Sequence, residues 1–215
     1  MDGDYELVIG SKNLSSWSLR PWLVLKAFNI PFKETLILLR RPDSRDNILR
    51  HSPSGKVPVL KSGSLTIWDS LAIIEFLAEG HPDAPIWPPG PEARAMARCV
   101  AAEMHSGFPA LRDEFPMSFI DIIGFPKASD KALDDISRIV EIWTGCRRRF
   151  GDGGAFLFGD FSAADAMFGP VASRFRSYEV DLARFGDDGS AARYRDAMMA
   201  MPEMQLWAEG ARAEV

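Results

Sequence analysis

The sequence predicts an α/β domain followed by an all-helical domain. Three observations support this: the first eighty residues alternate between strand and helix periods, prolines crowd 82–91, and the rest has helical period. With 215 residues, 47% hydrophobic and 26% charged, the chain can bury a real core as one large or two small domains. We divide it into a first domain at 1–81, a linker at 82–91 and a helical domain at 92–215.

The chain opens with the pattern of a βαβ unit. Tyr5–Gly10 is a short apolar strand, Leu19–Phe28 carries a helical stripe, and Phe32–Leu38 alternates as a second strand. This order predicts two parallel strands joined by a right-handed crossover. The polar stretch Asp43–His51 has room for one short helix.

A β-hairpin and a further helix complete the first domain. Val57–Leu60 and Leu65–Trp68 flank the turn Lys61–Ser64, which predicts a hairpin. Ser70–Glu79 follows with the period of a helix. The order β-α-β-α-β-β-α predicts a small sheet with helices packed on it.

Prolines then change the pattern, because the five prolines and one glycine at 82–91 exclude a helix or a central strand. Pro91 suits the first turn of the next helix. That helix can continue past Pro109 with a kink, and Pro202 ends the last helical pattern. The predicted helices are Glu92–Phe108, Ala128–Phe150, Ser162–Tyr178 and Ala191–Met201.

Charge and composition exclude several classes of function. The net charge is -5, and the one short basic run, Arg147–Arg149, ends a helix where it complements the dipole. No apolar run is long enough to cross a bilayer, and the acidic start Met1–Asp4 lacks the positive region of a signal peptide. We therefore expect a cytoplasmic protein with no nucleic-acid and no membrane partner.

The positions of the cysteines and histidines do not indicate a metal site. Cys99 and Cys146 lie in amphipathic helical patterns and are interpreted as two buried thiols in a reducing cytosol, with a disulfide between them left open. His51, His81 and His105 lack the spacing of metal ligands. His105, alone on a helix, is interpreted as a packing residue.

The loop between the first strand and the first helix is the first candidate site. Pro21 must lie in the first turn of its helix, so the helix begins near Trp17–Leu19 and leaves Ser15 and Ser16 just ahead of it. Free N–H groups and the helix dipole favour an anion there, and two hydroxyls can donate to it. One serine can instead be the N-cap, or a nucleophile, although no histidine–acid partner set is evident.

The second candidate site is Ser54–Leu60. Pro58 directly precedes a predicted inner strand, where proline is unusual unless its missing donor is useful. A cis Val57–Pro58 bond would leave the backbone groups of Val57 free to pair with an extended peptide ligand. An ordinary trans proline at a sheet edge is the alternative.

Two helix starts carry capping signals. Asp69 or Ser70 caps the helix that follows, and the same helix end can receive a ligand carboxylate with the Ser70 hydroxyl as a donor. Ser162 and Asp165 have the spacing of a capping box, with Asp in place of Glu, and are interpreted as structural.

Together these segments resemble the glutathione-binding half of cytosolic glutathione S-transferases. The segments are Ser15–Arg20, Lys56–Leu60 and Asp69–Leu77, and they are most similar to the zeta (maleylacetoacetate isomerase-like) class with its Ser-Ser-Cys-x-Trp-Arg motif. The proline-rich linker and Gly159–Asp165 also match the family layout. The resemblance therefore covers nearly the whole chain.

The resemblance implies a thioredoxin-like domain followed by an α-helical domain, a homodimer, and glutathione as the co-substrate. It implies that a hydroxyl at Ser15 or Ser16 hydrogen-bonds the glutathione sulfur. Val57, beside a cis Pro58, would pair with the cysteinyl unit of glutathione. The full glutathione-binding set is Lys56, Val57, Pro58, Asp69 and Ser70, of which the last two would hold the γ-glutamyl end.

The resemblance also places the electrophile in the helical domain. Met104 and Phe108 are candidates for the pocket wall and Arg112 for an acidic group, although helical spacing favours core packing for most apolar residues there. Two positions depart from the zeta pattern. Trp17 stands where zeta enzymes have a cysteine, and Ser177 stands where an arginine holds the isomerase substrate.

The sequence therefore predicts a glutathione transferase that stabilises the glutathione thiolate with a serine hydroxyl for attack on a small hydrophobic electrophile. A glutathione-dependent cis–trans isomerase and a non-enzymatic binding scaffold are the alternatives. The identity of the electrophile, and the choice between the two serines, are left open.

Overall fold

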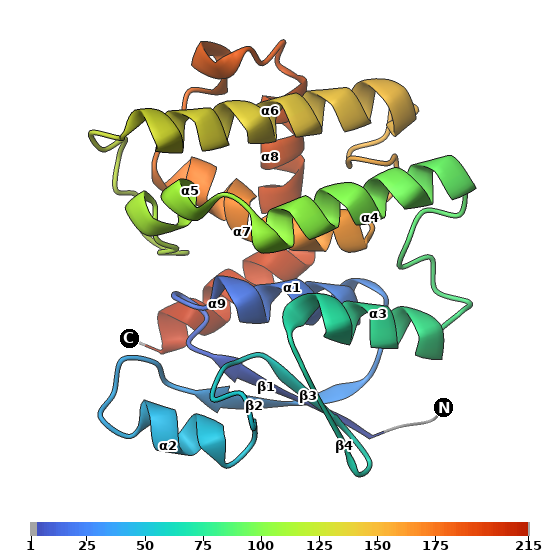
Figure 1. Ribbon diagram of the computed structural model, residues 1–215, viewed down its shortest axis with the longest axis vertical. Coiled ribbons are helices and arrows are strands. Elements are labelled where there is room, and N and C mark those ends of the chain that lie inside the picture. The colour runs from blue at the N-terminus through green and yellow to red at the C-terminus, as the bar shows by residue number, and fades with distance from the viewer. Residues whose placement is uncertain (1–3, 215) are drawn as a thin grey trace.

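The computed structural model describes residues 4–214. The first part of the chain forms a four-stranded sheet with helices on both faces (Figure 1). The acidic start at Met1–Gly3, which the sequence analysis used, lies outside the described residues. Helices α1 and α3 lie between the sheet and the helical part of the molecule, and α2 lies on the opposite face. The elements of this part are β1 (Tyr5–Gly10), α1 (Ser16–Ala27), β2 (Phe32–Ile37), α2 (Ser44–Leu49), β3 (Val59–Ser62), β4 (Leu65–Trp68) and α3 (Ser70–Gly80).

The strands have the order β2-β1-β3-β4. β1 and β2 are parallel, whereas β3 is antiparallel to both β1 and β4, so the βαβ unit and the hairpin are confirmed. β3 begins at Val59 rather than at Val57, so that Val57 and Pro58 lie outside the sheet.

The two faces of the sheet bury different side chains because successive residues of a strand point to opposite sides. Leu7 and Ile9 join the large core shared with α1 and α3. Val8 instead packs with Ile48 of α2 in a small second cluster. The sheet is therefore covered on both faces.

Residues 81–90 form no helix or strand, and the helical part begins at Pro91, the first residue of α4. The domain boundaries proposed from the sequence stay a prediction. The helices that follow are α4 (Pro91–Ser106), α5 (Pro109–Glu114), α6 (Asp130–Phe150), α7 (Ala163–Ser177), the 3₁₀ helix η1 (Leu182–Phe185), α8 (Ser190–Ala200) and α9 (Pro202–Ala213).

The first helix starts earlier than predicted. α1 begins at Ser16, so Ser16 is its first residue rather than a residue ahead of it, and Pro21 is its sixth residue rather than part of its first turn.

Two later helices also differ from the prediction. α4 ends at Ser106 and α5 is a separate helix, because Phe108 takes a left-handed conformation (φ 60°) ahead of Pro109, a residue that disfavours helical geometry at the preceding position. α9 was not predicted. Pro202 ends α8, as expected, but it is also the first residue of α9, where its missing N–H costs no hydrogen bond.

The two cysteines also differ from the prediction in part. Both are free, and Cys146 is buried, but Cys99 is exposed on α4. Its helix is amphipathic, and Cys99 lies on the solvent side of that helix. Burial raises the pKa of the Cys146 thiol to about 12.

Helices α1 and α7 join the two parts of the molecule. At Gly169 of α7, a Cβ atom would lie 2.8 Å from the Cδ1 atom of Leu23 in α1, so the two helices approach closely because this residue is glycine. Leu23 and Phe168, the neighbour of Gly169, belong to one continuous core region that spans sheet and helices. The contact between the two parts of the molecule is thus packed like the interior of a single domain.

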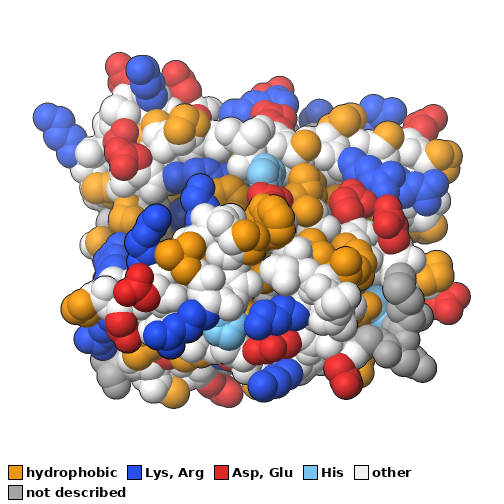
Figure 2. Space-filling view, turned by 60° about the horizontal axis from the view of Figure 1, so that its bottom comes forward, with side chains coloured by type: hydrophobic (Ala, Val, Ile, Leu, Met, Phe, Trp, Pro, Cys, Tyr) orange, Lys and Arg blue, Asp and Glu red, His pale blue; other side chains and the backbone are white. Residues whose placement is uncertain are grey.

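Acidic and basic side chains are interspersed over the face shown in Figure 2, with smaller hydrophobic areas between them. This distribution accords with a net charge of -5. Among the described helices, none has both the length and the apolar character needed to span a membrane.

Candidate active site

A groove with a volume of about 600 Å³ lies between the sheet domain and α4. It brings together all five residues that the resemblance assigned to glutathione binding. Four further residues, from α1, β4, α4 and the loop before β3, complete its wall. The lining residues are Trp17, Ser54, Lys56, Val57, Pro58, Trp68, Asp69, Ser70 and His105.

Val57 presents its backbone to this groove. The Val57–Pro58 peptide bond is cis, as the resemblance implied, and the trans alternative is wrong. Across the described residues, neither the N–H nor the C=O of Val57 has a backbone partner, and the ladder of β3 starts two residues later. An extended peptide can therefore pair with Val57 as an added strand.

The N-terminus of α3 offers a second set of donors. Asp69 is its N-cap, because its Oδ1 atom accepts hydrogen bonds from the backbone N–H groups of Leu71 (2.9 Å) and Ala72 (3.3 Å). Ser70 is only 1% exposed, and its hydroxyl has no hydrogen-bond partner within residues 4–214. The Ser70 hydroxyl is therefore free to donate to a ligand, and a carboxylate fits the positive end of a helix.

His105 of α4 also lines the groove, a position that its interpretation as a packing residue did not predict. Its Nε2 atom lies 2.7 Å from Oδ2 of Asp69, and the side chain lines the groove. Burial raises the pKa of Asp69, but the hydrogen bonds from His105 and from the backbone of Leu71 and Ala72 outweigh it and hold that pKa below its usual value. No sequence signal pointed to this pair, because 36 positions separate the two residues.

Ser15 and Ser16 lie at the beginning of α1 and are both almost buried, at 5% and 6% exposure. Ser15 is the N-cap: its Oγ atom accepts from the backbone N–H of Ser18 (3.3 Å) and donates to the Ser18 hydroxyl (2.7 Å). In the described chain the Ser16 side chain forms no such bond. Neither serine is among the residues that line the groove.

Trp17, the residue that follows these serines, borders the groove itself. Its ring lines the groove and meets the ring of His105 edge-on at 5.4 Å. The guanidinium carbons of Arg20 and Arg112 lie 4.2 and 4.8 Å from the centre of the indole. The tryptophan that replaces the zeta cysteine is therefore held by two cations.

The residues predicted to bind the electrophile lie mainly in the core. Met104 and Phe108 are 1% and 5% exposed and do not line the groove, as their helical spacing favoured. Arg112 is half-buried, and it donates to the carbonyl of Gly107 (3.0 Å) and contacts that of Met104. Ser177 is buried, and its hydroxyl donates to the Ser118 carbonyl at 2.9 Å.

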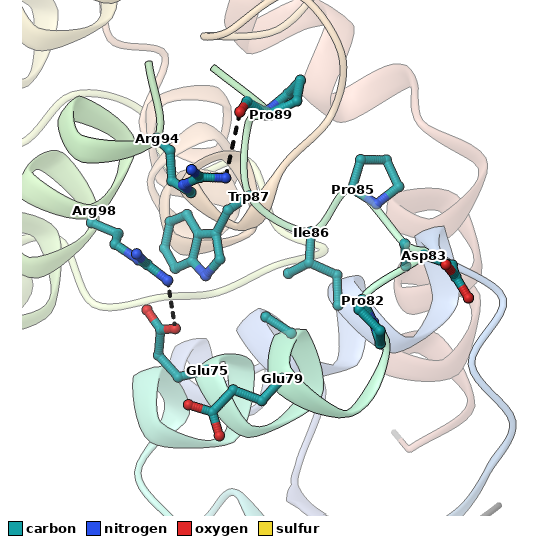
Figure 3. Close-up of a pocket in the computed structure, with 12 residues that line it drawn as sticks. Glu75, Glu79, Pro82, Asp83, Pro85, Ile86, Trp87, Pro89, Arg94 and Arg98 are labelled. Atoms are coloured by element: carbon teal, nitrogen blue, oxygen red, sulfur yellow. Dashed lines mark hydrogen bonds and ion pairs between the residues drawn. The ribbon is translucent and has the colours of Figure 1, made fainter. Parts of the chain in front are cut away.

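A second cavity, of about 610 Å³, lies between α3, the linker and the start of α4 (Figure 3). Arg98 bonds Glu75 across it at 3.3 Å, and Arg94 donates to the carbonyl of Pro89 at 3.4 Å. Its main cations thus already have partners within the protein. It contains no residue that the sequence analysis assigned to a site.

No cluster of three or more histidine, cysteine or carboxylate residues suited to a metal ion occurs in the part of the chain that the structure describes. The polar groups of the groove include a hydroxyl, the N-terminal end of a helix and unpaired backbone N–H and C=O groups. These are groups that bind a peptide and an anion.

Comparison with known families agrees with this geometry. The N-terminal domain profile of glutathione S-transferases matches residues 14–79, and the C-terminal domain profile matches residues 126–209. The chain belongs to the glutathione S-transferase family. It is therefore an enzyme of the glutathione transferase kind, with glutathione as its co-substrate.

Several curated members of the family are similar in sequence. A probable maleylacetoacetate isomerase 1 of Drosophila melanogaster is 31% identical over 78% of this chain and 67% of that protein, and the rat maleylacetoacetate isomerase is 25% identical over 89% and 86%. A probable maleylacetoacetate isomerase of Caenorhabditis elegans is 35% identical, but the match spans 46% of this chain and 45% of that protein. The family relationship is thus zeta-like.

Solved structures show the same fold. A Burkholderia glutathione transferase homolog with bound glutathione superposes with a TM-score of 0.71 at 22% identity, covering 99% of this chain and 100% of that one. An Omega 2S glutathione transferase from Trametes versicolor gives a TM-score of 0.73 at 20% identity, covering 99% and 96%. The thioredoxin-like domain and the helical domain are those of the family.

Proposed function

We propose that the groove binds glutathione and that a serine hydroxyl at the start of α1 stabilises its thiolate for attack on a small hydrophobic electrophile. The observation that carries the binding of glutathione is the buried Ser70 hydroxyl, which has no partner within the described residues and lines the same groove as the free backbone of Val57. The role of a serine hydroxyl rests on the family resemblance and on the position of Ser15 and Ser16 at the start of α1, since neither serine lines the groove. Ser70 with the N-terminus of α3 supplies donors for the γ-glutamyl carboxylate. Val57 supplies both groups of a strand pair for the cysteinyl unit.

The energy required at the sulfur is modest. A free thiol has a pKa near ~8.5, and lowering it to about 6.5 corresponds to about 2.7 kcal/mol. One charge-assisted hydrogen bond from a hydroxyl contributes about 1.5–3 kcal/mol, and a helix N-terminus about 0.3–1 kcal/mol. Thiolate formation therefore requires no ionisable base, and the released proton passes to water.

The two serines differ in what they can donate. The Ser15 hydroxyl caps α1 and already donates to Ser18, so its proton is engaged. The Ser16 hydroxyl, at the first residue of α1, has no such engagement in the described structure, which favours it as the donor to sulfur. Both lie where the helix dipole favours an anion.

Separate alanine variants test this proposal. In Ser16→Ala we expect the pH at which bound glutathione ionises, followed by ultraviolet difference spectra, to rise by about one unit or more. In Ser15→Ala we expect a loss of about 1 kcal/mol in the free energy of unfolding, because a helix cap is removed, with a smaller shift of the titration. Titrations that coincide with that of the wild type in both variants would refute the hydroxyl mechanism.

Two assays test the proposed groove and reaction. Retention on immobilised glutathione together with conjugation of a chlorodinitrobenzene-type electrophile supports the proposal. Absence of binding at millimolar glutathione in a variant with an altered Ser70, beside retention of the wild type, supports the groove as the binding site. Turnover of a cis-enedione with glutathione regenerated supports an isomerase, the activity named for several of the relatives.

The isomerase alternative has less support from the site. The residue at the position of the zeta substrate arginine is Ser177, whose hydroxyl is already bonded to Ser118. Arg174, one turn earlier, is buried and donates to the carbonyls of Phe115 (2.8 Å) and Pro170 (3.1 Å). We therefore propose conjugation, rather than isomerisation, as the reaction of this site.

A homodimer in the cytoplasm is part of the same proposal. The family resemblance implies the dimer, and the two free cysteines suit a reducing compartment. Sedimentation velocity tests the dimer, since a monomer at assay concentration would contradict it. Cell fractionation tests the location.

A further inference from the structure

The loop from β1 to α1 (Ser11–Ser15) is bonded to a helix that is distant in the sequence. Both backbone groups of Lys12 in this loop have partners in α9. The Lys12 N–H donates to the carboxylate of Glu214 at 2.9 and 2.8 Å, and the Lys12 C=O accepts from the indole N–H of Trp207 at 2.8 Å. Figure 1 shows the C-terminal end of α9 beside the sheet domain. The position of the loop therefore depends on α9.

The stability of α9 does not explain the position of Glu214. This residue is the C-cap of α9, where the helix dipole disfavours a negative charge. Burial raises the pKa of Glu214 and the charge of Glu34 raises it further, whereas the backbone N–H groups of Lys12 and Asn13 and the charge of Lys12 lower it. The carboxylate thus has its favourable contacts in the loop and not in its own helix.

A turn connects Lys12 to the serines. The N–H groups of Leu14 and Ser15 donate to the carbonyl of Ser11 at 3.0 and 2.8 Å. Lys12 and Asn13 lie inside this turn, and within residues 4–214 their N–H groups have no backbone partner. A displacement of Lys12 therefore moves Ser15 and the start of α1 with it.

The loop is also held on a second side. The C=O of Asn13 accepts from the N–H of Phe119 at 3.1 Å, and its Oδ1 atom accepts from the N–H of Ile120 at 3.0 Å. Two separate segments of the helical part, α9 and residues 118–120, therefore fix the loop. A hydroxyl that must lie at hydrogen-bond distance from a sulfur requires such constraints, because small displacements weaken the bond.

We propose that Glu214 is a positioning residue for the serine hydroxyl that stabilises the glutathione thiolate. Its carboxylate does not touch the sulfur. It holds Lys12, and the turn at Ser11–Ser15 then holds the Ser16 hydroxyl at the distance that its hydrogen bond requires. The thiol proton passes to water, and no other bond changes. This inference rests on the proposed function, because it requires glutathione in the groove and a serine as the donor.

Substitutions of Glu214 test the inference. In Glu214→Ala we expect the pH at which bound glutathione ionises, followed by ultraviolet difference spectra, to rise by about half a unit, which is about a threefold loss of thiolate at a pH below both values. The affinity for glutathione should change by less than about twofold, because Val57 and Ser70 belong to other segments. Glu214→Gln retains one acceptor oxygen and should return part of the shift. Glu209→Ala, which removes an exposed carboxylate of the same helix, should titrate as the wild type does.

Two further measurements separate positioning from a purely structural role. Hydrogen exchange at the Lys12 amide should become about tenfold faster in Glu214→Ala, while the amides of β1 should exchange as in the wild type. The unfolding temperature should fall by no more than a few degrees, because the carboxylate is partly exposed and opposes the helix dipole. A structural role alone would lower the unfolding temperature and leave the ionisation of bound glutathione unchanged.

The outcomes distinguish the two proposals. If the wild type binds glutathione but the thiol ionises at its free pKa, both the serine mechanism and this inference fail. If the wild type lowers that pKa and Glu214→Ala lowers it equally, the role of Glu214 is overturned and the serine mechanism stands. Should Glu214→Ala not fold, the same comparison is made in Glu214→Gln, where a titration equal to that of the wild type overturns the role. Loss of folding in both variants also overturns it, because the fold itself would then require the carboxylate.

Discussion

At the residue scale, Asp69 joins the two parts of the site. One of its carboxylate oxygens caps α3, and the other bonds His105, which belongs to the helical part of the chain. These bonds hold the pKa of Asp69 below its usual value in spite of burial. The carboxylate therefore keeps its charge to a lower pH and can face the ammonium group of a bound γ-glutamyl unit.

We expect His105→Ala to weaken glutathione binding about threefold to tenfold, because Asp69 loses its lateral hydrogen bond. The pKa of Asp69 should rise in this variant, so affinity should begin to fall at a higher pH than in the wild type as the solution is acidified. Calorimetric titration at several pH values measures both effects. His51→Ala, which removes a histidine outside the groove, should bind as the wild type does, and equal affinities in all three proteins would contradict the role of His105.

At the element scale, the start of α7 shows how one buried carboxylate orders a loop. Asp165 completes the predicted capping box with Ser162, and its other oxygen accepts from the N–H of Leu157 at 3.0 Å. Burial raises the pKa of Asp165 to about 6 although the hydrogen bonds to Leu157 and Ser162 oppose this. The folded state therefore binds a proton at a pH where the unfolded chain has already released it.

This pKa predicts the sign of a pH dependence. Between the usual value of 3.8 and about 6, the folded protein holds more protons at Asp165, so the contribution of this group to the free energy of unfolding decreases as pH rises. Asp165→Asn should unfold more readily than the wild type, since one amide oxygen would replace two carboxylate oxygens that accept from three buried donors, the N–H of Leu157 and the N–H and hydroxyl of Ser162. The difference between the two should be larger at about pH 4.5 than at about pH 7 in urea unfolding.

A matched variant is available for this measurement. Asp160→Asn changes an exposed carboxylate of the same loop and should leave the pH dependence parallel to that of the wild type. A difference between wild type and Asp165→Asn that is equal at both pH values would show that Asp165 does not titrate in this range.

At the scale of the whole molecule, α9 returns to the sheet domain and holds the loop that precedes the site. Trp207 packs edge-on against Trp22 at 5.0 Å, and its indole N–H donates to the carbonyl of Lys12 at 2.8 Å. The carboxylate of Glu214 accepts from the N–H of Lys12 at 2.9 and 2.8 Å. The loop that leads from β1 to Ser15 is thus held from a distant part of the chain.

We expect Trp207→Ala to lower the free energy of unfolding by about 3–5 kcal/mol, because it removes a fully buried aromatic side chain at the junction of the two parts. Leu206→Ala, which changes an exposed neighbour on the same helix, should stay within about 0.5 kcal/mol of the wild type. Denaturant unfolding measures both. Equal small losses in the two variants would mean that α9 does not hold the loop.

Much of this architecture could be predicted from local sequence. Tyr5–Gly10 was predicted with its observed bounds, and Ser162 and Asp165 form the capping box that their spacing indicated. α9 was missed because proline both ends one helix and begins another, and sequence period alone does not separate the two cases. Cys99 was misplaced because both faces of α4 carry small side chains, so that its period was ambiguous.

The residues of the groove that we propose bind glutathione were predictable because each lies at a helix start or strand end that local chemistry marks, as at Val57, Asp69 and Ser70. Only the tertiary structure brought His105 to Asp69, placed Trp17 in the wall of the groove, and buried Arg20 without a hydrogen-bond partner among residues 4–214. The reason is physical. Caps and turns depend on neighbours a few positions away in the sequence. The partners and burial of a charged or aromatic side chain depend instead on the distant segment that packs against it.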